Sequence, residues 1–285
     1  MATLDIHPIA GALGAEIHGI DLSQALDEKT FSTIQKALHD HLVIFFRDQT
    51  ITPDQHLAFA RRFGDVETHR YAKGLDSHPE VLPVIKEADD RAANFGGIWH
   101  SDVAFHAEPP MGQILYALEV PDSGGDTIFV NMYQAYETLS DGMKRMLVGV
   151  NGVFTGERSY GPSDSEVTKR QALFSKSMDV KLMNNADDET VHPLIRTHPD
   201  TGRKSLFISG IAIRRLEGMT VEESRPILRF LKKHATRAEN TCQFRWSKGS
   251  IAFWDNRCTQ HYALNDYHGH RRVMHRVTIA GDRPA

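Results

Sequence analysis

The fold is limited mainly by a series of short apolar segments with strand composition, separated by turn residues and not regularly alternating with helices. They occupy residues 42–46, 80–86, 112–120 and 126–131, and further ones follow in TCQFRW, SIAFWD and RRVMHRVTIAG. A parallel α/β fold would need a helix between successive strands. The pattern therefore predicts a mainly β protein with inserted helices, either a sandwich or a jelly roll.

The inserted helices are predicted from spacing and capping signals. Residues 28–42 carry apolar side chains at helical intervals, and residues 132–149 also have helical composition. Thr52, Pro53 and Gln55 form an N-cap, N1 and N3 signature, so a helix should begin at Pro53. A second capping box, Thr220 with Glu223, precedes the helical segment VEESRPILRFLKKHAT.

Between Gly156 and Glu189 the chain becomes polar and has few apolar anchors. Long irregular segments in compact domains are usually lids or disordered insertions, and the sequence leaves both open. β-sandwiches and barrels of 285 residues are often single domains. We therefore expect one domain over residues 1–285, with a lid insertion at about 156–189.

Composition points to a small-molecule partner. Charged residues make up 25% of the chain and the net charge is −4, so no overall basic field favours nucleic acid or an anionic membrane. No apolar run approaches the roughly 18 residues of a membrane span. Cys242 and Cys258 are the two cysteines, and the N-terminal residues lack signal-peptide features, so we expect a cytoplasmic protein.

The stretch IWHSDVAFH contains His100, Asp102 and His106 at even spacing. In extended chain such residues share one face. An imidazole beside a carboxylate could be half of a metal site, half of an acid/base pair, or a buried hydrogen bond. His261 follows a predicted strand and could supply a third ligand. Two histidines and one carboxylate on one face of an octahedron are typical of non-haem Fe(II) oxygenases, whereas Zn(II) more often has four ligands rich in His or Cys.

Two arginines in the last predicted strand offer sites for anions. Arg272 and Arg276 are four residues apart, so in a strand both guanidinium groups lie on one face. The planar guanidinium binds carboxylates or sulfonates in bidentate fashion, so the pair indicates two anionic ligands. The alternative is a solvated basic edge strand, since Arg271 is adjacent.

These motifs together resemble a known family. The segments WHSDVAFHAEPP, GGDTIFVNMYQAYETLS, HPLIRTHPDTGRKSLF and WDNRCTQHYALNDYHGHRRVMHRVTIAGDRP are similar to the taurine dioxygenase family of Fe(II)/2-oxoglutarate-dependent oxygenases. The resemblance runs from GAEIHGIDLS to AGDRP, nearly the whole chain, and implies a double-stranded β-helix (jelly roll) around one iron. It implies that His100, Asp102 and His261 are the iron ligands.

The resemblance also implies roles for the remaining site residues. Thr127 and Arg272 match the positions that hold the C5 carboxylate of 2-oxoglutarate. Arg276 and His69 match positions near the anionic group of the primary substrate, and Phe105 would form part of an apolar wall. Trp254, Asp255 and Asn256 would pack and position the strand before His261. His106 has no assigned role, and contact with either the ligands or the substrate is open.

Two departures leave the substrate open. Gly96 stands where taurine dioxygenase has an asparagine near the amine of its substrate, and LFISG replaces its LFVN pattern. Relatives oxidise alkylsulfonates, alkyl sulfate esters or aryloxyalkanoates. We expect a dioxygenase that uses Fe(II), 2-oxoglutarate and O2 to hydroxylate the carbon beside the anionic or ether group of a small organic anion. It would release succinate, CO2 and a carbonyl fragment, and would be a homodimer or homotetramer. The alternatives are a non-catalytic jelly-roll binding protein and a Zn-dependent hydrolase.

Overall fold

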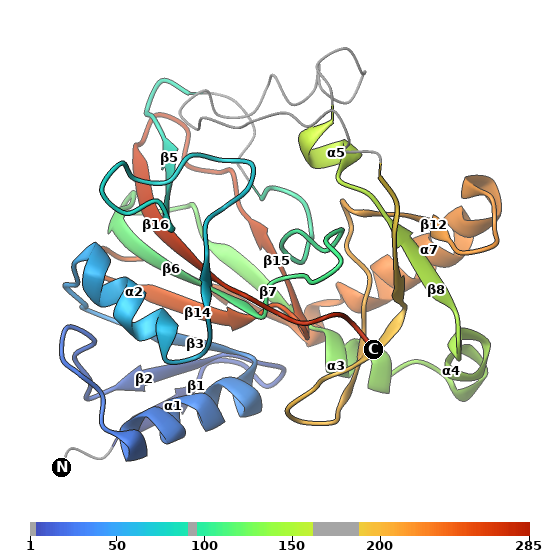
Figure 1. Cartoon of the computed structure of the whole chain (residues 1–285), viewed down its shortest axis with the longest axis horizontal. Coiled ribbons are helices and arrows are strands. Elements are labelled where there is room, and N and C mark those ends of the chain that lie inside the picture. Colours follow the sequence, from blue (N-terminus) through green and yellow to red (C-terminus); the bar gives the residue numbers. More distant parts are fainter. Residues whose placement is uncertain (1–3, 91–95, 162–187) are drawn as a thin grey trace.

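The computed structural model describes residues 4–90, 96–161 and 188–285 (Figure 1). Most of the predicted lid, residues 162–187, lies outside this part of the chain. The described residues form a mainly β structure, and the short strands and inserted helices predicted from the sequence are confirmed.

The largest element is an eight-stranded sheet in which β2 pairs with β3 in parallel and the other neighbours pair antiparallel. Its order is β1 (Asp5–Pro8), β2 (Ala15–His18), β3 (Val43–Phe46), β14 (Ile251–Asp255), β6 (Gly112–Glu119), β16 (Arg272–Ile279) and β4 (Val66–Glu67), and β5 (Val81–Lys86) also pairs with β16.

A three-stranded antiparallel sheet faces the large one. Its order is β13 (Thr241–Phe244), β7 (Thr127–Asn131) and β15 (Thr259–Ala263). Phe45 of the large sheet stacks on Phe244 of the small one, with ring centroids 3.9 Å apart. Phe129 lies between Phe45 and Trp254, at 5.8 Å and 5.6 Å. The two sheets therefore pack face to face over an aromatic core.

Side-chain alternation in the large sheet separates two cores. Ile44 and Phe46 of β3 pack with the helices α1 (Glu28–His41) and α2 (Pro53–Arg61), whereas Val43 and Phe45 pack toward the small sheet. Figure 1 shows both helices on one side of the large sheet. The capping box of Thr52 and Gln55 is present, and α2 begins at Pro53, as predicted.

The outer side of the small sheet is covered by a third core. Most of the remaining described elements surround it: α3 (Met132–Glu137), α4 (Asp141–Leu147), the sheet β12 (Ile213–Leu216), β8 (Asn151–Phe154) and β9 (Thr190–Pro193), the hairpin β10 (Ile195–Thr197) and β11 (Lys204–Leu206), and α7 (Val221–Ala235). Two short elements complete the described structure: α5 (Glu157–Tyr160), whose Tyr160 belongs to this core, and the 3-10 turn η1 (Ala238–Asn240).

One helix prediction is wrong in detail. Residues 132–149 form two short helices, because the Ser140 side chain accepts a hydrogen bond from the Met143 backbone and starts α4 as a new helix. The predicted capping box of Thr220 and Glu223 is present at the start of α7.

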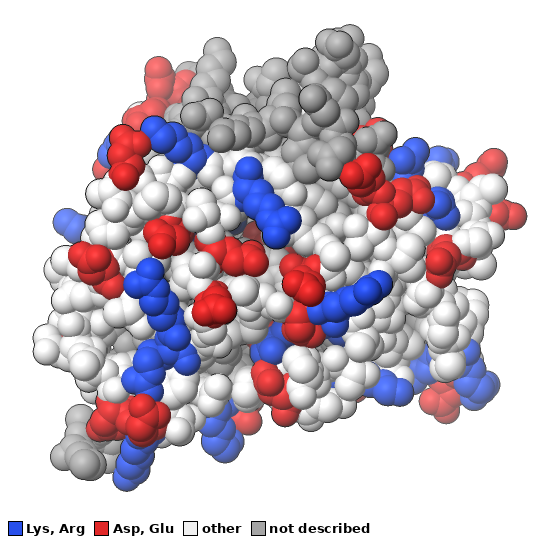
Figure 2. Space-filling model, viewed as in Figure 1, with Lys and Arg blue, Asp and Glu red and all other residues white. Residues whose placement is uncertain are grey.

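The surface carries mixed charge. On the face shown in Figure 2, Lys and Arg side chains are interspersed with Asp and Glu. Among the described residues, none of the helices combines the length and the apolar character needed to cross a lipid bilayer.

Candidate active site

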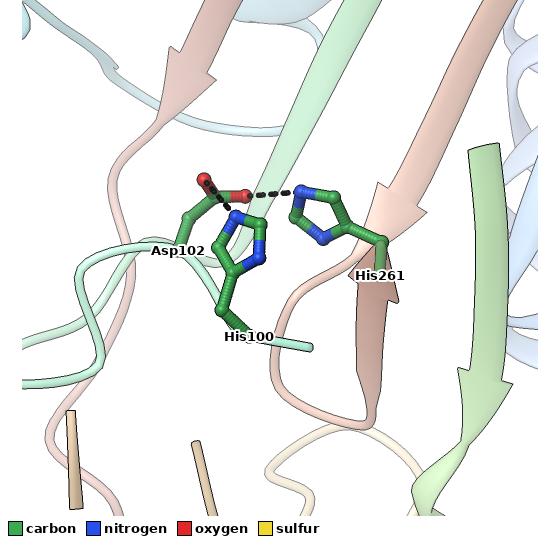
Figure 3. Close-up of side chains that lie close together, drawn as sticks. All are labelled: His100, Asp102 and His261. Carbon is green, nitrogen blue, oxygen red and sulfur yellow. Dashed lines mark ion pairs between the residues drawn. The ribbon is translucent and has the colours of Figure 1, made fainter. Parts of the chain in front are cut away.

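Three predicted metal ligands converge between the two sheets (Figure 3). The carboxylate of Asp102 lies between two imidazoles, with Oδ1 3.8 Å from His100 Nε2 and Oδ2 3.7 Å from His261 Nε2. The two imidazole centroids are 4.1 Å apart. One potential ligand atom from each residue lies within 4.8 Å of the others. This confirms that the three distant side chains come together.

The backbone brings His100 to His261 through an isolated β-bridge. The His100 N–H donates to the His261 carbonyl at 3.1 Å, and the His261 N–H donates to the His100 carbonyl at 2.9 Å. His261 belongs to β15 and pairs with Phe129 of β7, so its side chain points to the space between the sheets.

The extended conformation considered for residues 98–106 is wrong. After His100 the chain turns, and Val103 has a φ of 38°. Asn256 stabilises the turn, because its Oδ1 accepts from the Asp102 N–H at 2.8 Å and its Nδ2 donates to the Asp102 carbonyl at 3.0 Å. A contact with a residue 154 positions away cannot be read from local periodicity.

The first histidine and the carboxylate are held by further contacts. His100 Nδ1 lies 2.6 Å from the Ile98 carbonyl, which favours a proton on Nδ1 and leaves the Nε2 lone pair for a metal. Trp254 Nε1 donates to Asp102 Oδ2 at 3.3 Å. Trp254 and Asn256 thus position Asp102, which is more specific than the packing role expected from the sequence.

Gly96 suits both the backbone conformation and the space beside His100. It has a φ of +86°, a conformation that favours glycine, and a Cβ there would lie 3.2 Å from His100 Cε1. A side chain at this position would crowd the imidazole.

Electrostatics favour a cation-binding state. Burial lowers the pKa of His261 to about 3, so its imidazole is neutral. Burial raises the pKa of Asp102, but the neighbouring His261, Arg276 and His100 together lower it by more than burial raises it. The net pKa of Asp102 is therefore below its usual range. A neutral imidazole next to an ionised carboxylate is the protonation state that a metal needs. Two histidines and one carboxylate fit non-haem Fe(II).

A buried cation lies where 2-oxoglutarate was predicted to bind. Arg272 is 6% exposed, and its Nε and Nη2 have no hydrogen-bond partner among the described residues. Burial lowers its pKa. Its guanidinium carbon is 5.7 Å from the ring of Trp246, whose Nε1 donates to Thr127 Oγ1 at 3.0 Å. Arg272 and Thr127 therefore both lie next to the indole of Trp246.

The alternative of a solvated basic edge strand is wrong. β16 is an interior strand, paired with β6 and with β5 and β4, and Arg272 and Arg276 are both buried. The neighbouring Arg271 is the exposed arginine, and it forms ion pairs with Glu87 at 2.8 Å and Glu119 at 2.6 Å.

The predicted substrate residues lie beside the carboxylate ligand. Arg276 Nη1 is 3.3 Å from Asp102 Oδ1. Burial and the charge of Arg276 lower the pKa of His69 to about 3, while the charge of Asp102 acts in the opposite direction. His69 Nδ1 accepts from the Tyr71 N–H at 3.3 Å, so the neutral imidazole carries its proton on Nε2.

An aromatic cluster continues this side of the site. Phe105, predicted to form an apolar wall, is buried with its ring 5.9 Å from Tyr71 and 6.0 Å from Tyr160. Tyr160 was missed because it lies in the polar segment after Gly156. Burial raises its pKa, which also responds to the charges of Arg276 and Asp102. His106 binds the Tyr71 hydroxyl at 2.6 Å through Nε2 and is not part of the ligand cluster.

The mainly β fold and the donor set of two histidines and one carboxylate place the protein in the class of non-haem iron oxygenases. The model of the "Taurine catabolism dioxygenase TauD, TfdA family" matches residues 5–278, and the chain belongs to this family.

Relatives with known names agree with this assignment. The chain is 36% identical to an alpha-ketoglutarate-dependent sulfate ester dioxygenase of Pseudomonas putida, over 99% of this chain and 91% of that protein. It is 37% identical to an alkylsulfatase of Acinetobacter baylyi, over 98% of this chain and 86% of that protein. The structure is similar to a taurine dioxygenase from Burkholderia xenovorans, with a TM-score of 0.83, 34% identity, and coverage of 100% of this chain and 91% of that one.

Proposed function

We propose that this protein is an Fe(II)/2-oxoglutarate-dependent dioxygenase that hydroxylates the carbon next to the anionic or ether group of a small organic anion. The unstable hydroxylated product divides into a carbonyl fragment and a leaving group, and succinate and CO2 are released. For an alkyl sulfate ester, the products are an aldehyde and sulfate. For an alkylsulfonate they are an aldehyde and sulfite, and for an aryloxyalkanoate a phenol and an oxoacid.

The single observation that carries this proposal is the position of Arg272. It is a buried guanidinium with two N–H groups that lack partners among the described residues, on the same face of β16 as Arg276, which contacts Asp102. Burying a guanidinium with N–H groups that lack hydrogen-bond partners is costly, so this position favours an anionic ligand. A keto diacid could place one carboxylate against these N–H groups of Arg272 and reach the metal ligands with its other end.

Each part of the site then has a defined task. His100, Asp102 and His261 would hold Fe(II), which activates O2 when 2-oxoglutarate is bound. Arg272 and the Thr127 hydroxyl would bind the far carboxylate of 2-oxoglutarate. Arg276 and the Nε2–H of His69 would bind the substrate anion, and Phe105 would pack against its organic part and exclude water.

Alkyl sulfate esters are the first substrates to test. Two relatives at 36% and 37% identity are named for sulfate esters and for alkyl sulfates, and both align over nearly the whole chain. A sulfate monoester presents one strongly acidic anionic group, which suits a site with Arg276 as its fixed cation. Alkylsulfonates such as taurine and aryloxyalkanoates share this anionic end and complete the panel.

The same proposal includes the finer architecture. In this proposal the two facing sheets are the halves of a double-stranded β-helix. One domain over residues 1–285 and a lid at about 156–189, most of which lies outside the described residues, remain predictions. The dimeric or tetrameric state and the cytoplasmic location remain predictions.

The decisive test is substrate-dependent succinate release across a panel of alkyl sulfates, alkylsulfonates and aryloxy acids, with Fe(II), in air. An oxygenase converts an alkyl sulfate to an aldehyde and needs both O2 and 2-oxoglutarate. A Zn-dependent hydrolase would form the alcohol without O2, and a binding protein would form neither product. Arg276→Ala should raise the KM for the sulfate while leaving 2-oxoglutarate binding near the wild-type value. Alcohol as the product, or no turnover of any panel member, would contradict the proposal.

A further inference from the structure

A second cavity lies on the opposite face of β15 from the metal ligands. Strand alternation directs His261 inward and directs its neighbours Gln260 and Tyr262 outward. Gln260 and Tyr262 line a cavity of about 320 Å³, together with residues of α7 and of the segment just before His100. The cavity is therefore separate from the candidate active site and shares one strand with it.

The walls of this cavity are apolar and partly aromatic. Ile98, Trp99, Ile208 and Tyr262 line it, and the rings of Trp99 and Tyr262 have centroids 5.7 Å apart. Ligand pockets typically occupy about 300 to 1,000 Å³, with apolar walls and a few polar groups that set specificity. The size and lining fit a small molecule with an aromatic or alkyl body.

The distinctive polar group in the cavity is Lys232 of α7. Its Nζ donates to the Gly210 carbonyl at 3.1 Å, and no carboxylate among the described residues forms an ion pair with it. Burial, with a smaller contribution from the charge of Arg158, lowers the pKa of Lys232 to about 8. Lys233, which is exposed, lines the same cavity. Among the described residues, the local charge is therefore positive.

From this cavity and its lysine, which forms no ion pair with a carboxylate of the described residues, we infer a second binding site, for a small organic anion with an aromatic or alkyl body. The anion would pair with Lys232, and its body would pack between Trp99 and Tyr262. Binding would recover part of the cost of burying the ammonium group.

The cavity borders the segment that orients one metal ligand. Ile98 and Trp99 precede His100 directly, and the Ile98 carbonyl is the partner of His100 Nδ1. A ligand that moves Ile98 would change the hydrogen bond that orients this imidazole. The inference does not depend on which substrate the enzyme oxidises.

The test uses 8-anilinonaphthalene-1-sulfonate, an aromatic monoanion whose fluorescence rises in apolar surroundings, titrated into the full chain. We expect saturable binding that weakens at least tenfold in Lys232→Met and persists in Lys232→Arg. Lys29→Met, which removes an exposed lysine on α1, is the matched control and should bind as the wild type does.

A second pair of variants keeps the test independent of any folding defect in Lys232→Met. Ile98 is 47% exposed and lines the cavity, so Ile98→Glu and Ile98→Gln differ there almost only in charge. The Glu variant should bind the probe at least tenfold more weakly than the Gln variant. Equal affinity of the Ile98→Glu and Ile98→Gln variants for the probe would overturn the inference. Loss of probe binding in Arg276→Ala would also overturn it, because that result would place the probe in the active site.

Discussion

Replacement of Arg272 by alanine should abolish most of the affinity for 2-oxoglutarate. Two N–H groups of this buried guanidinium lack partners among the described residues, so the far carboxylate can accept both. Removing one member of a buried, hydrogen-bonded charge pair costs about 2 to 5 kcal/mol. Since about 1.4 kcal/mol is a factor of ten, the expected rise in Kd is roughly 30-fold to 4,000-fold.

The assay is anaerobic titration of the Fe(II)-loaded protein with 2-oxoglutarate, followed by calorimetry. Arg272→Lys keeps the charge but loses the planar fork, so its affinity should be intermediate. Arg276→Ala removes the neighbouring arginine on the same face and should leave the Kd for 2-oxoglutarate within a few-fold of wild type. Thermal unfolding of each variant without ligand shows whether it is folded.

The reasoning about Arg272 fails if a folded Arg272→Ala variant binds 2-oxoglutarate as tightly as wild type does. It also fails if Arg276→Ala loses as much 2-oxoglutarate affinity as Arg272→Ala, because the two arginines would then not have separate ligands.

Three further predictions concern other parts of the structure. Asp255→Asn should lower the free energy of unfolding by about 1.5 to 3 kcal/mol, because the buried Arg257 loses its charge-assisted hydrogen bonds to Asp255 while it keeps its ion pair with Asp200. Urea denaturation that shows no loss would refute this. Burial raises the pKa of Asp255, but Arg257 lowers it more, so the net pKa is depressed. The stabilisation is therefore complete above the unfolded pKa of about 3.9 and is lost as the pH falls further, and the acid slope should be shallower in Asp255→Asn. Thr127→Val should weaken 2-oxoglutarate binding by about 1 kcal/mol, roughly fivefold, in the anaerobic titration used for Arg272→Ala. An unchanged Kd would show that Thr127 does not bind 2-oxoglutarate. In Gly156→Ala the new Cβ would lie 2.8 Å from the Phe105 ring and would displace it. The KM for the primary substrate should therefore change while the Kd for 2-oxoglutarate stays constant. A change in both constants would argue for a general defect.

Much of the architecture could be predicted because it depends on local signals. The caps at Thr52 and Thr220 start helices where the sequence places them. The strand containing Arg272 and Arg276 alternates as expected, which puts both guanidinium groups on the inner face. The ligand triad followed from family motifs more than from periodicity, since His261 is far from His100 in the chain.

The missed features depend on contacts between distant parts of the chain. The turn at Asp102 is held by hydrogen bonds from the distant Asn256. The alternation of side chains expected for an extended segment after His100 therefore could not predict this turn. Tyr160 lies in a polar stretch, yet it is 5% exposed because Tyr71 packs on it with ring centroids 4.3 Å apart. The Lys232 cavity requires α7 to lie over the outer face of β15, and no spacing in the sequence specifies that.

The central claim is that His100, Asp102 and His261 hold an iron that 2-oxoglutarate can also bind. The most direct measurement is the visible absorption spectrum after anaerobic addition of Fe(II) and 2-oxoglutarate to the purified chain. The account predicts a weak visible metal-to-ligand charge-transfer band in the wild type and its loss in Asp102→Ala. A wild-type protein that stays colourless with both components present, or an Asp102→Ala variant with an undiminished band, would contradict it.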